Sequence, residues 1–291
     1  MESQNQSTMN PLLIETISNL PPLPKTITEL QEYIEKSGAD TEASKVAEIL
    51  SKDPLIVGEL LRLANSPFYG FSRQISTIQQ VVSLLGINNI KNIVMANAIS
   101  STFPIDVSPY GLDTQTFLAG CSKEVEFISA WLNDEDKQLA NTLIPCAMLL
   151  RLGIILLSSI LLRSGKSEDF LRENKENEFR DLYDLENKYC GIDNLSFLGF
   201  LFDHWKFDEL LIGSIAHIQN PHSAPDEIKK NAYALAIVNC LFEPYAPLSP
   251  FNAKKAIALI NEAKASNVNF DTSNFLAKLP QEAKDNLLQQ D

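Results

Sequence analysis

Histidine is scarce in this sequence of 291 residues, and no histidine precedes residue 204. His204, His217 and His222 form neither an HExxH motif nor a His-Asp dipeptide. A metal centre needs several imidazole or carboxylate ligands at defined spacings, so the sequence predicts no metal site and no metal cofactor. No serine or cysteine lies at a convincing spacing from a histidine, and we therefore predict no catalytic residues.

Cysteine is also sparse, and no CxxC pair occurs. Isolated cysteines in a chain of this length are typical of reduced, structural thiols, so we expect a cytoplasmic protein. The first ten residues are polar and lack the basic start and the apolar stretch of a signal peptide. We expect residues 1–11 to be a disordered N-terminus. The cysteines are Cys121, Cys146, Cys190 and Cys240.

Basic residues are outnumbered, with 24 Lys and Arg against 37 Asp and Glu, which gives a formal net charge of −13. Such a chain repels phosphate backbones at long range, so we expect no nucleic-acid partner. Residues 143–162 are apolar and long enough to span a membrane. Arg151 lies near their centre, however, where it costs about 2.5–3.5 kcal/mol on insertion scales. We interpret this segment as a buried core helix and expect no membrane partner.

Strict alternation of apolar and polar residues is nearly absent, and apolar residues recur instead at helical spacing. The sequence therefore predicts an all-α fold. Asp53 followed by Pro54 is a helix start signal. Ser76 with Gln79 fits a capping box, and Asn88 is expected to cap the next helix. The expected helices cover about residues 12–20, 26–37, 46–51, 54–65, 77–85, 88–99, 113–132, 137–163, 168–189, 194–203, 207–218, 226–242, 252–265 and 280–289.

Residues 77–99 have the order helix, glycine turn, helix, which is the outline of a DNA-binding helix-turn-helix. A recognition helix needs cationic and amide side chains aimed at phosphates and bases. Residues 88–99 offer four asparagines but a single cation, Lys91. A packed helix pair is the favoured interpretation, and a DNA-binding regulator is kept as an alternative.

Three phrases of the sequence together resemble the HDOD family, a regulatory branch of the HD phosphohydrolase superfamily. The first is LPPLP at residues 20–24. The second is LSKDPL at residues 50–55, which continues to LLRLANSPFY at residues 60–69. The third covers residues 75–86 and ends in Leu-Leu-Gly. A looser match runs from Glu186 through Gly191 to Trp205 and on to His217, so that the resemblance covers about residues 12–220.

The resemblance implies a multi-helix bundle like that of the HD superfamily, with an HDOD domain at residues 12–222. Residues 223–291 fall outside the match. We expect them to form a C-terminal helical extension packed on the core, because Ala232, Leu235, Ala236 and Val238 form an apolar stripe.

Catalytic members of the superfamily hold one or two metals with a His, an adjacent His-Asp pair and a later Asp, and the metal activates a bound water. The resemblance places the His-Asp pair at Leu150 and Arg151, which would not bind a divalent ion. It places Asn194 where many members carry a His, and His217 with Ile218 where many have two histidines. Leu150, Arg151, Asn194 and His217 are thus interpreted as vestigial metal-site positions.

The resemblance therefore implies a bacterial, non-enzymatic protein of signal transduction that acts by binding protein partners through helical surfaces. Settings of the family include cyclic-dinucleotide regulation, chemotaxis, motility and stress response. A residual metal-dependent phosphohydrolase is kept as an alternative. Neither the partner nor the oligomeric state follows from the sequence.

Arg151 also allows a prediction about contacts. An unpaired charge in an apolar helix is very costly, so we predict a salt bridge or a set of backbone carbonyls around the guanidinium. Glu186 is the candidate acid. An alternative is that Arg151 and His217 together bind a small anion, such as a phosphate-bearing ligand.

Overall fold

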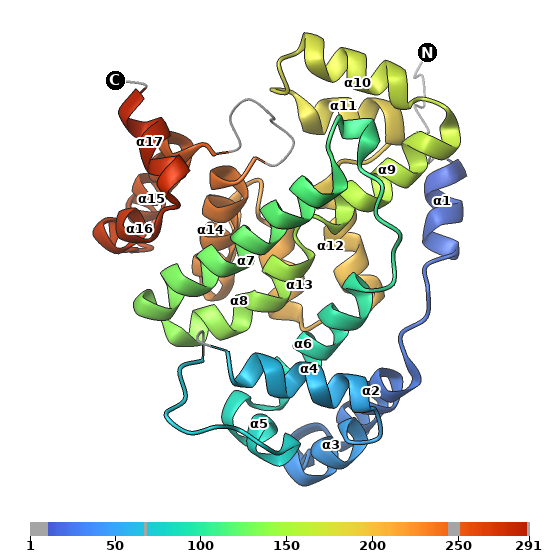
Figure 1. Cartoon of the computed structure of the whole chain (residues 1–291), viewed down its shortest axis with the longest axis vertical. Helices are drawn as coiled ribbons and strands as arrows, with labels where there is room; N and C mark the ends of the chain where they lie inside the picture. Colours follow the sequence, from blue (N-terminus) through green and yellow to red (C-terminus); the bar gives the residue numbers. More distant parts are fainter. Residues whose placement is uncertain (1–10, 67–68, 244–250, 290–291) are drawn as a thin grey trace, which may run out of the picture.

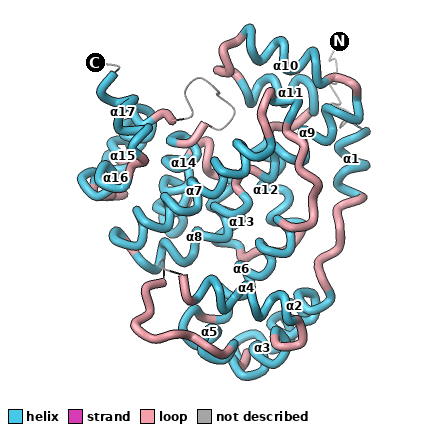
Figure 2. Tube along the Cα trace, in the orientation of Figure 1, coloured by secondary structure: helices cyan, strands magenta, loops and turns pink. Residues whose placement is uncertain are grey.

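The computed structural model describes residues 11–66, 69–243 and 251–289. In these ranges the chain forms helices and short 3-10 turns without a β-strand, apart from a lone antiparallel bridge between Phe242 and Phe251. Figures 1 and 2 show helices packed against one another throughout the described chain. The predicted all-α fold is confirmed. Of the N-terminus expected to be disordered, residues 1–10 lie outside the described residues, and Pro11 begins the first helix.

The N-terminal helices include the one that begins at the predicted cap, Asp53. Its carboxylate accepts hydrogen bonds from the amides of Leu55 and Ile56, which confirms this helix start. These helices are α1 (Pro11–Ser18), α2 (Lys25–Ser37), α3 (Ala43–Leu50), α4 (Pro54–Ala64), α5 (Ile78–Leu85) and α6 (Ile87–Ser100).

The capping box of α5 lies one residue later than predicted. Thr77 and Gln80 make the two reciprocal hydrogen bonds, because this register buries Ile78 against the core. The cap predicted at Asn88 is wrong. Helix α6 begins at Ile87, immediately after Gly86, so Asn88 already lies inside it.

The central helices are α7 (Thr114–Glu135), α8 (Lys137–Leu149) and α9 (Leu152–Ser164). We predicted a single helix over 137–163, and this is wrong because the helix is interrupted at Leu150 and Arg151. The interruption lets the two helices pack on different neighbours. Helix α8 packs on α6 and α7, whereas α9 packs on α12 (Asn194–His204). Gly153 of α9 approaches α12 so closely that a Cβ would overlap the carbonyl oxygen of Asn194.

Residues 137–164 are long and apolar enough to cross a membrane, by length and composition alone. In the structure, 83% of their most apolar window is buried inside the protein. Other helices therefore cover these apolar side chains, which supports our interpretation of residues 143–162 as a core segment.

The helix predicted over 168–189 is also divided, into α10 (Ser167–Glu176) and α11 (Leu182–Cys190). The Phe179 amide donates to the Asn174 carbonyl and the Glu178 amide to the Lys175 carbonyl, which is the Schellman closure of a helix end. Glu178 and Phe179 both have positive φ, 52° and 61°. Glycine usually takes such a position, and because no glycine stands here, the turn could not be predicted from the sequence.

The C-terminal helices share one core with the rest of the described chain. Helix α14 packs on α8 and on α13 (Glu209–Ala216), α15 packs on α14, and α16 packs on α7. Phe275 of α16 lies edge-on to Trp131 and Phe127 of α7. We did not predict α16, whose seven residues are too few to show a period. These helices are α14 (Asp226–Leu241), α15 (Ala253–Ala265), α16 (Thr272–Lys278) and α17 (Gln281–Gln289).

Candidate functional site

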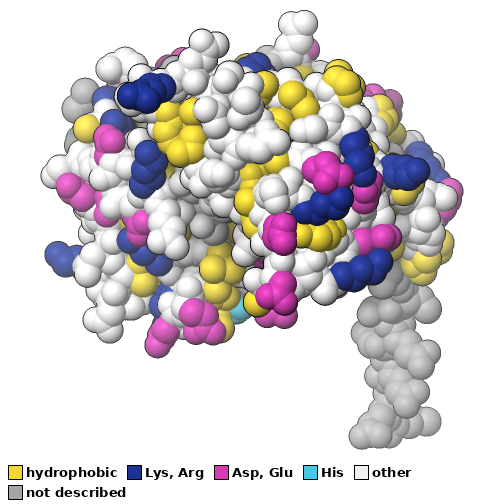
Figure 3. Space-filling model, turned by 90° about the horizontal axis from the view of Figure 1, so that it is seen from below, with side chains coloured by type: hydrophobic (Ala, Val, Ile, Leu, Met, Phe, Trp, Pro, Cys, Tyr) yellow, Lys and Arg dark blue, Asp and Glu magenta, His cyan; other side chains and the backbone are white. Residues whose placement is uncertain are grey.

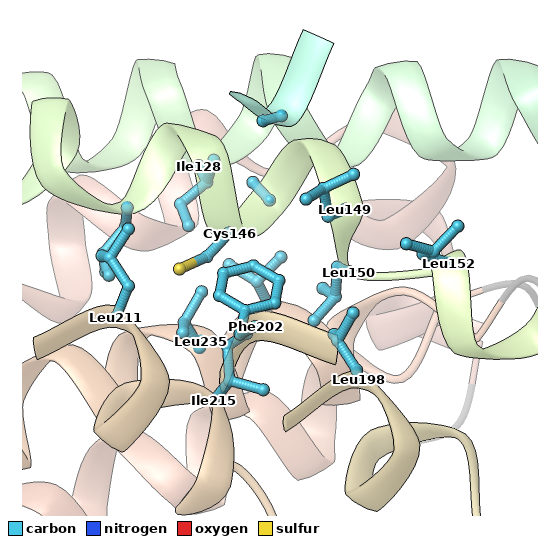
Figure 4. Packing of buried hydrophobic residues seen from close by; sticks show 14 of the residues in the cluster. Ile128, Cys146, Leu149, Leu150, Leu152, Leu198, Phe202, Leu211, Ile215 and Leu235 are labelled. Carbon is cyan, nitrogen blue, oxygen red and sulfur yellow. The ribbon is translucent and has the colours of Figure 1, made fainter. Parts of the chain in front are cut away.

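Leu150, the first of the positions that we interpreted from the sequence as vestigial metal-site positions, lies in the apolar core at the end of α8. Its side chain has no exposed surface. Figure 4 shows it among the side chains of Leu149, Leu198 and Phe202, which come from α8 and α12. Hydrocarbon side chains offer no atom that coordinates a cation, so this position is used for packing alone.

Arg151 is buried in the interruption between α8 and α9, and only 3% of its surface is exposed. Its Nε donates to both carboxylate oxygens of Glu124 on α7, at 2.9 and 3.1 Å. Its Nη1 donates to the Asn239 side-chain oxygen at 2.7 Å, and its Nη2 donates to the Phe242 carbonyl at 2.7 Å. The predicted salt bridge is confirmed, together with a carbonyl contact, but the acid is Glu124 and not Glu186.

The Arg151–Glu124 pair is shielded from water, because Glu124 has no exposed surface. Burial raises the pKa of Glu124 to about 7, and the guanidinium of Arg151 opposes this shift. Arginine stays charged at any pH the protein meets, so the carboxylate is held beside a permanent cation. Removing either partner would leave the other as an uncompensated buried group.

Glu186, the acid we had expected for Arg151, holds a second polar cluster. It accepts hydrogen bonds from the Tyr110 hydroxyl at 2.7 Å and from the Asn194 backbone amide at 2.8 Å. The Asn194 side-chain amide donates to the same carboxylate at 2.8 and 3.0 Å. Burial raises the pKa of Glu186 to about 7, and the hydrogen bonds from Tyr110 and Asn194 oppose this shift. Asn194 therefore holds the carboxylate of Glu186 in place through its backbone amide and its side-chain amide.

His217 follows α13, where its Nδ1 lies 2.8 Å from the Gly213 carbonyl oxygen. No hydrogen bond among the described residues joins it to Arg151, whose guanidinium contacts Glu124 and Asn239. Leu150 and Arg151 are adjacent between α8 and α9, and Gly153 at the start of α9 approaches Asn194 at the start of α12. No hydrogen bond among the described residues connects His217 with these positions. The anion site that we considered for Arg151 and His217 finds no support in these contacts.

No group of three or more His, Cys, Asp or Glu side chains that could hold a metal ion occurs in the part of the chain that the structure describes. At the His-Asp position the structure holds an aliphatic side chain and an arginine paired with Glu124. These residues do not fit a divalent metal ion, because the one carboxylate at the position already serves the guanidinium.

Sequence reasoning missed four residues of these clusters, namely Tyr110, Glu124, Tyr183 and Asn239. Asn239 extends the Arg151 cluster, because it accepts from Arg151 and its Nδ2 donates to the Tyr183 hydroxyl on α11 at 3.1 Å. A signal existed for Glu124, which is spaced seven residues from both Phe117 and Trp131 and so lies on the buried stripe of α7. The other three carry no sequence mark that distinguishes them from ordinary polar helix residues.

The helix-turn-helix-like segment 77–99 forms α5 and α6, and α6 is largely buried. Lys91 makes an ion pair with Asp208, which also accepts a hydrogen bond from the Asn92 side chain at 2.8 Å. The single cation of the segment is therefore engaged within the protein. On the face shown in Figure 3, basic and acidic side chains are interspersed.

Comparisons with known proteins identify the same family as the sequence phrases do. The HDOD domain family model matches residues 20–221. A virulence factor from Campylobacter jejuni subsp. jejuni has a crystal structure that is similar at 53% sequence identity and a TM-score of 0.62, over 96% of this chain and 100% of that one. A proposed phosphohydrolase from Shewanella amazonensis SB2B is similar in fold, with 24% identity and a TM-score of 0.62 over 90% of this chain and 91% of that one.

A curated relative is known as well, an uncharacterized protein from Treponema pallidum (strain Nichols). It is 23% identical over 246 residues, which are 82% of this chain. The match covers 45% of that protein, so this chain spans less than half the length of the relative.

Proposed function

We propose, since this chain belongs to the HDOD family, that it is a non-enzymatic regulator which acts by binding proteins of a signalling pathway. The observation that carries the proposal is the buried ion pair between Arg151 and Glu124. It lies at the position where the family resemblance places a metal-binding His-Asp pair. A cation fixed to the chain thus lies where catalysis would need a metal ion.

Two physical reasons support the loss of metal chemistry. The guanidinium repels a divalent ion, and its hydrogen bonds already use Glu124, Asn239 and the Phe242 carbonyl. A metal ion that took Glu124 would leave a buried guanidinium without its acid, at a cost on the order of 3–5 kcal/mol. Neither reason depends on which metal is offered.

The test is metal content together with hydrolysis. The full chain would be purified with Mn²⁺, dialysed and analysed for bound metal. It would then be assayed with Mn²⁺ on nucleoside phosphates and on bis(p-nitrophenyl) phosphate. We expect far less than one metal ion per chain and no turnover above that of buffer. One metal per chain with turnover that follows the elution profile of the protein would overturn the proposal, whereas a contaminating hydrolase would elute separately.

The proposed partners are proteins, because the net charge of −13 disfavours nucleic acid and the single cation of segment 88–99 is already paired. The proposed location is the cytoplasm, which the unpaired state of all four cysteines supports. Chemotaxis, motility and cyclic-dinucleotide signalling are the settings that the family suggests.

Partner binding is tested by cross-linking in the source bacterium, affinity capture of the full chain and mass spectrometry. Each candidate is then purified and mixed with this protein, and the complex is measured by analytical ultracentrifugation. We expect at least one captured protein to form a complex of defined stoichiometry. A DNA shift in a low-salt gel, with no protein complex that can be reconstituted, would favour the DNA-binding alternative instead.

A further inference from the structure

A cavity of about 1090 Å³ opens to the surface between α11, α14 and α15, beside the turn that ends α10. Its volume is slightly above the range of typical small-molecule sites, roughly 300–1,000 Å³. Leu182, Ile218 and Leu259 supply apolar wall, and Phe179 lines it from the turn. None of the four vestigial metal-site positions lines it, so this cavity is distinct from the centre described above.

The polar end of the cavity is formed by Tyr183 and Asn239, and a chain of hydrogen bonds leads to it from the core. Arg151 donates to the Asn239 oxygen at 2.7 Å, and the Asn239 amide donates to the Tyr183 hydroxyl at 3.1 Å. The Tyr183 oxygen is therefore an acceptor, and its own proton is left to donate. Each bond in such a chain polarises the next, so the guanidinium makes the Tyr183 hydroxyl a stronger donor toward the cavity.

Three acidic and three basic residues line the cavity, so their formal charges balance. Its acidic residues are engaged: Glu178 pairs with Arg180, Glu243 accepts from Asn252 at 3.4 Å, and Glu262 accepts from Tyr233 at 3.0 Å. Two further cations, Lys175 and Lys255, also line the cavity. Neither lysine makes a salt bridge with a carboxylate among the described residues, although the nearby charge of Lys255 opposes the rise that burial causes in the pKa of Glu243.

The turn beside the cavity is held in an uncommon conformation. Glu178 and Phe179 are consecutive non-glycine residues with positive φ. Such backbone costs of order 1–3 kcal/mol per residue and persists only where surrounding contacts fix it, most often at functional sites. Here its effect is to hold the Phe179 ring at the cavity wall.

We propose that this cavity binds a small organic anion. The anionic group accepts a hydrogen bond from the Tyr183 hydroxyl and lies near the ammonium of Lys255, and the apolar body lies against Phe179, Leu182 and Leu259. The ligand site exists independently of which protein partners the molecule has. Its hydrogen-bond chain ends at Arg151, so an occupied cavity contacts the same network that holds α7 and α14 together.

The test uses a pair of fluorescent probes that share one aromatic body. The anionic probe is 8-anilinonaphthalene-1-sulfonate, and the neutral probe is N-phenyl-1-naphthylamine. Both are titrated into the full-length wild type, Tyr183→Phe and Lys255→Gln. Lys254→Gln is the matched control, because Lys254 is the neighbouring exposed lysine on α15 but does not line the cavity. Circular dichroism and thermal unfolding show that each variant is folded.

We expect the anionic probe to bind with a stoichiometry of one. Its Kd should rise roughly tenfold in Tyr183→Phe and in Lys255→Gln, because each change removes one interaction with a charged group. The Kd of the neutral probe should stay the same in both, and Lys254→Gln should behave as wild type. Competition by acetate or by inorganic phosphate, at constant ionic strength, then distinguishes carboxylate from phosphate ligands.

Three results would overturn the proposal. The first is that the anionic probe shows no saturable binding to the wild type. The second is that Tyr183→Phe and Lys255→Gln weaken the binding of both probes equally. The third is that Lys254→Gln weakens the binding of the anionic probe as much as Lys255→Gln does. If Tyr183→Phe does not fold, the comparison of Lys255→Gln with Lys254→Gln decides alone, because both lysines are exposed and their replacement leaves the core unchanged.

Discussion

At the scale of one residue, Arg151 shows which contacts can be predicted from the sequence and which cannot. A cation within an apolar run must find a partner, and that part of the prediction is confirmed by Glu124. The identity of the acid could not be predicted, because Glu124 and Glu186 are both buried carboxylates on helices near α9. Only the packing of α7 beside the interruption at Arg151 decides between them.

Replacing Arg151 with methionine should be strongly destabilising, because it leaves Glu124 buried without its cation. We expect Arg151→Met to lower the free energy of unfolding by about 3–5 kcal/mol. The double variant with Glu124→Leu should recover much of this loss. Urea denaturation measures both values.

The matched control is Arg163→Met, because Arg163 lies on the same helix α9 and pairs with Glu15 at an exposed site. An exposed ion pair contributes only about 0–1 kcal/mol. If Arg151→Met and Arg163→Met lower the free energy of unfolding by the same amount, the buried Arg151–Glu124 pair contributes no more to stability than an exposed ion pair.

Glu186 gives a prediction about pH. Burial raises its pKa from 4.5 to about 7, so between these values the folded protein binds a proton that the unfolded chain has lost. Stability should therefore fall as pH rises through this window, by up to about 1.4 kcal/mol per pH unit from this group. Glu124, whose pKa burial also raises to about 7, contributes a similar slope in the same window. Glu186→Gln removes one of these two titrations and should reduce the slope by roughly half, as measured by urea denaturation from pH 4.5 to 7.

Glu176→Gln is the control for this profile, since Glu176 is an exposed residue at the end of α10. It should leave the slope unchanged. A Glu186→Gln profile as steep as that of the wild type would show that other groups cause the pH dependence.

At the scale of elements, helix existence was predictable and helix interruption was not. The residues on both sides of Leu150 and Arg151 are apolar, so the hydrophobic period continues across the break. The division between α10 and α11 was hidden for another reason, because Glu178 stands where a glycine would have marked the turn. Both divisions depend on contacts with helices that are distant in the sequence.

The approach of α9 to α12 can be tested at Gly153. A Cβ there would overlap the Asn194 carbonyl oxygen, and backbone atoms have little freedom to move away. We expect Gly153→Ala to destabilise the protein by about 1–3 kcal/mol or more, despite the higher helix propensity of alanine. Thermal unfolding provides the measurement.

Gly58→Ala is the control with the opposite expected sign. Gly58 lies inside α4, and nothing comes within 4 Å of a Cβ at this position. Alanine should stabilise the protein there by roughly 0.5–1 kcal/mol. A stabilising effect of Gly153→Ala would mean that α9 and α12 do not pack as closely as described.

At the scale of the whole molecule, the all-α class follows from the period of the apolar residues, and the family follows from the combined phrases in the first third of the chain. The way in which the C-terminal helices join the core could not be predicted, because it depends on aromatic contacts between α16 and α7. A helix as short as α16 gives too few residues for a period.

Phe275 tests whether the C-terminal helices belong to the same cooperative unit. It is fully buried between Trp131 and Phe127, so Phe275→Ala should cost about 3–5 kcal/mol. The adjacent Leu276 is 37% exposed, and Leu276→Ala should cost much less. We expect circular dichroism and tryptophan fluorescence to show one coincident transition. Separate transitions would indicate that the C-terminal helices unfold on their own.

The Arg151–Glu124 pair has a consequence for substitutions at this position. A bound metal can be lost, chelated or exchanged, whereas a guanidinium cannot leave the chain that carries it. The centre is therefore the same whether a cell is starved of metal or supplied with it. A change to a metal site at this position would require coordinated substitutions, because a substitution that removes Arg151 alone leaves Glu124 buried without a cation. The pair is therefore hard to replace one residue at a time.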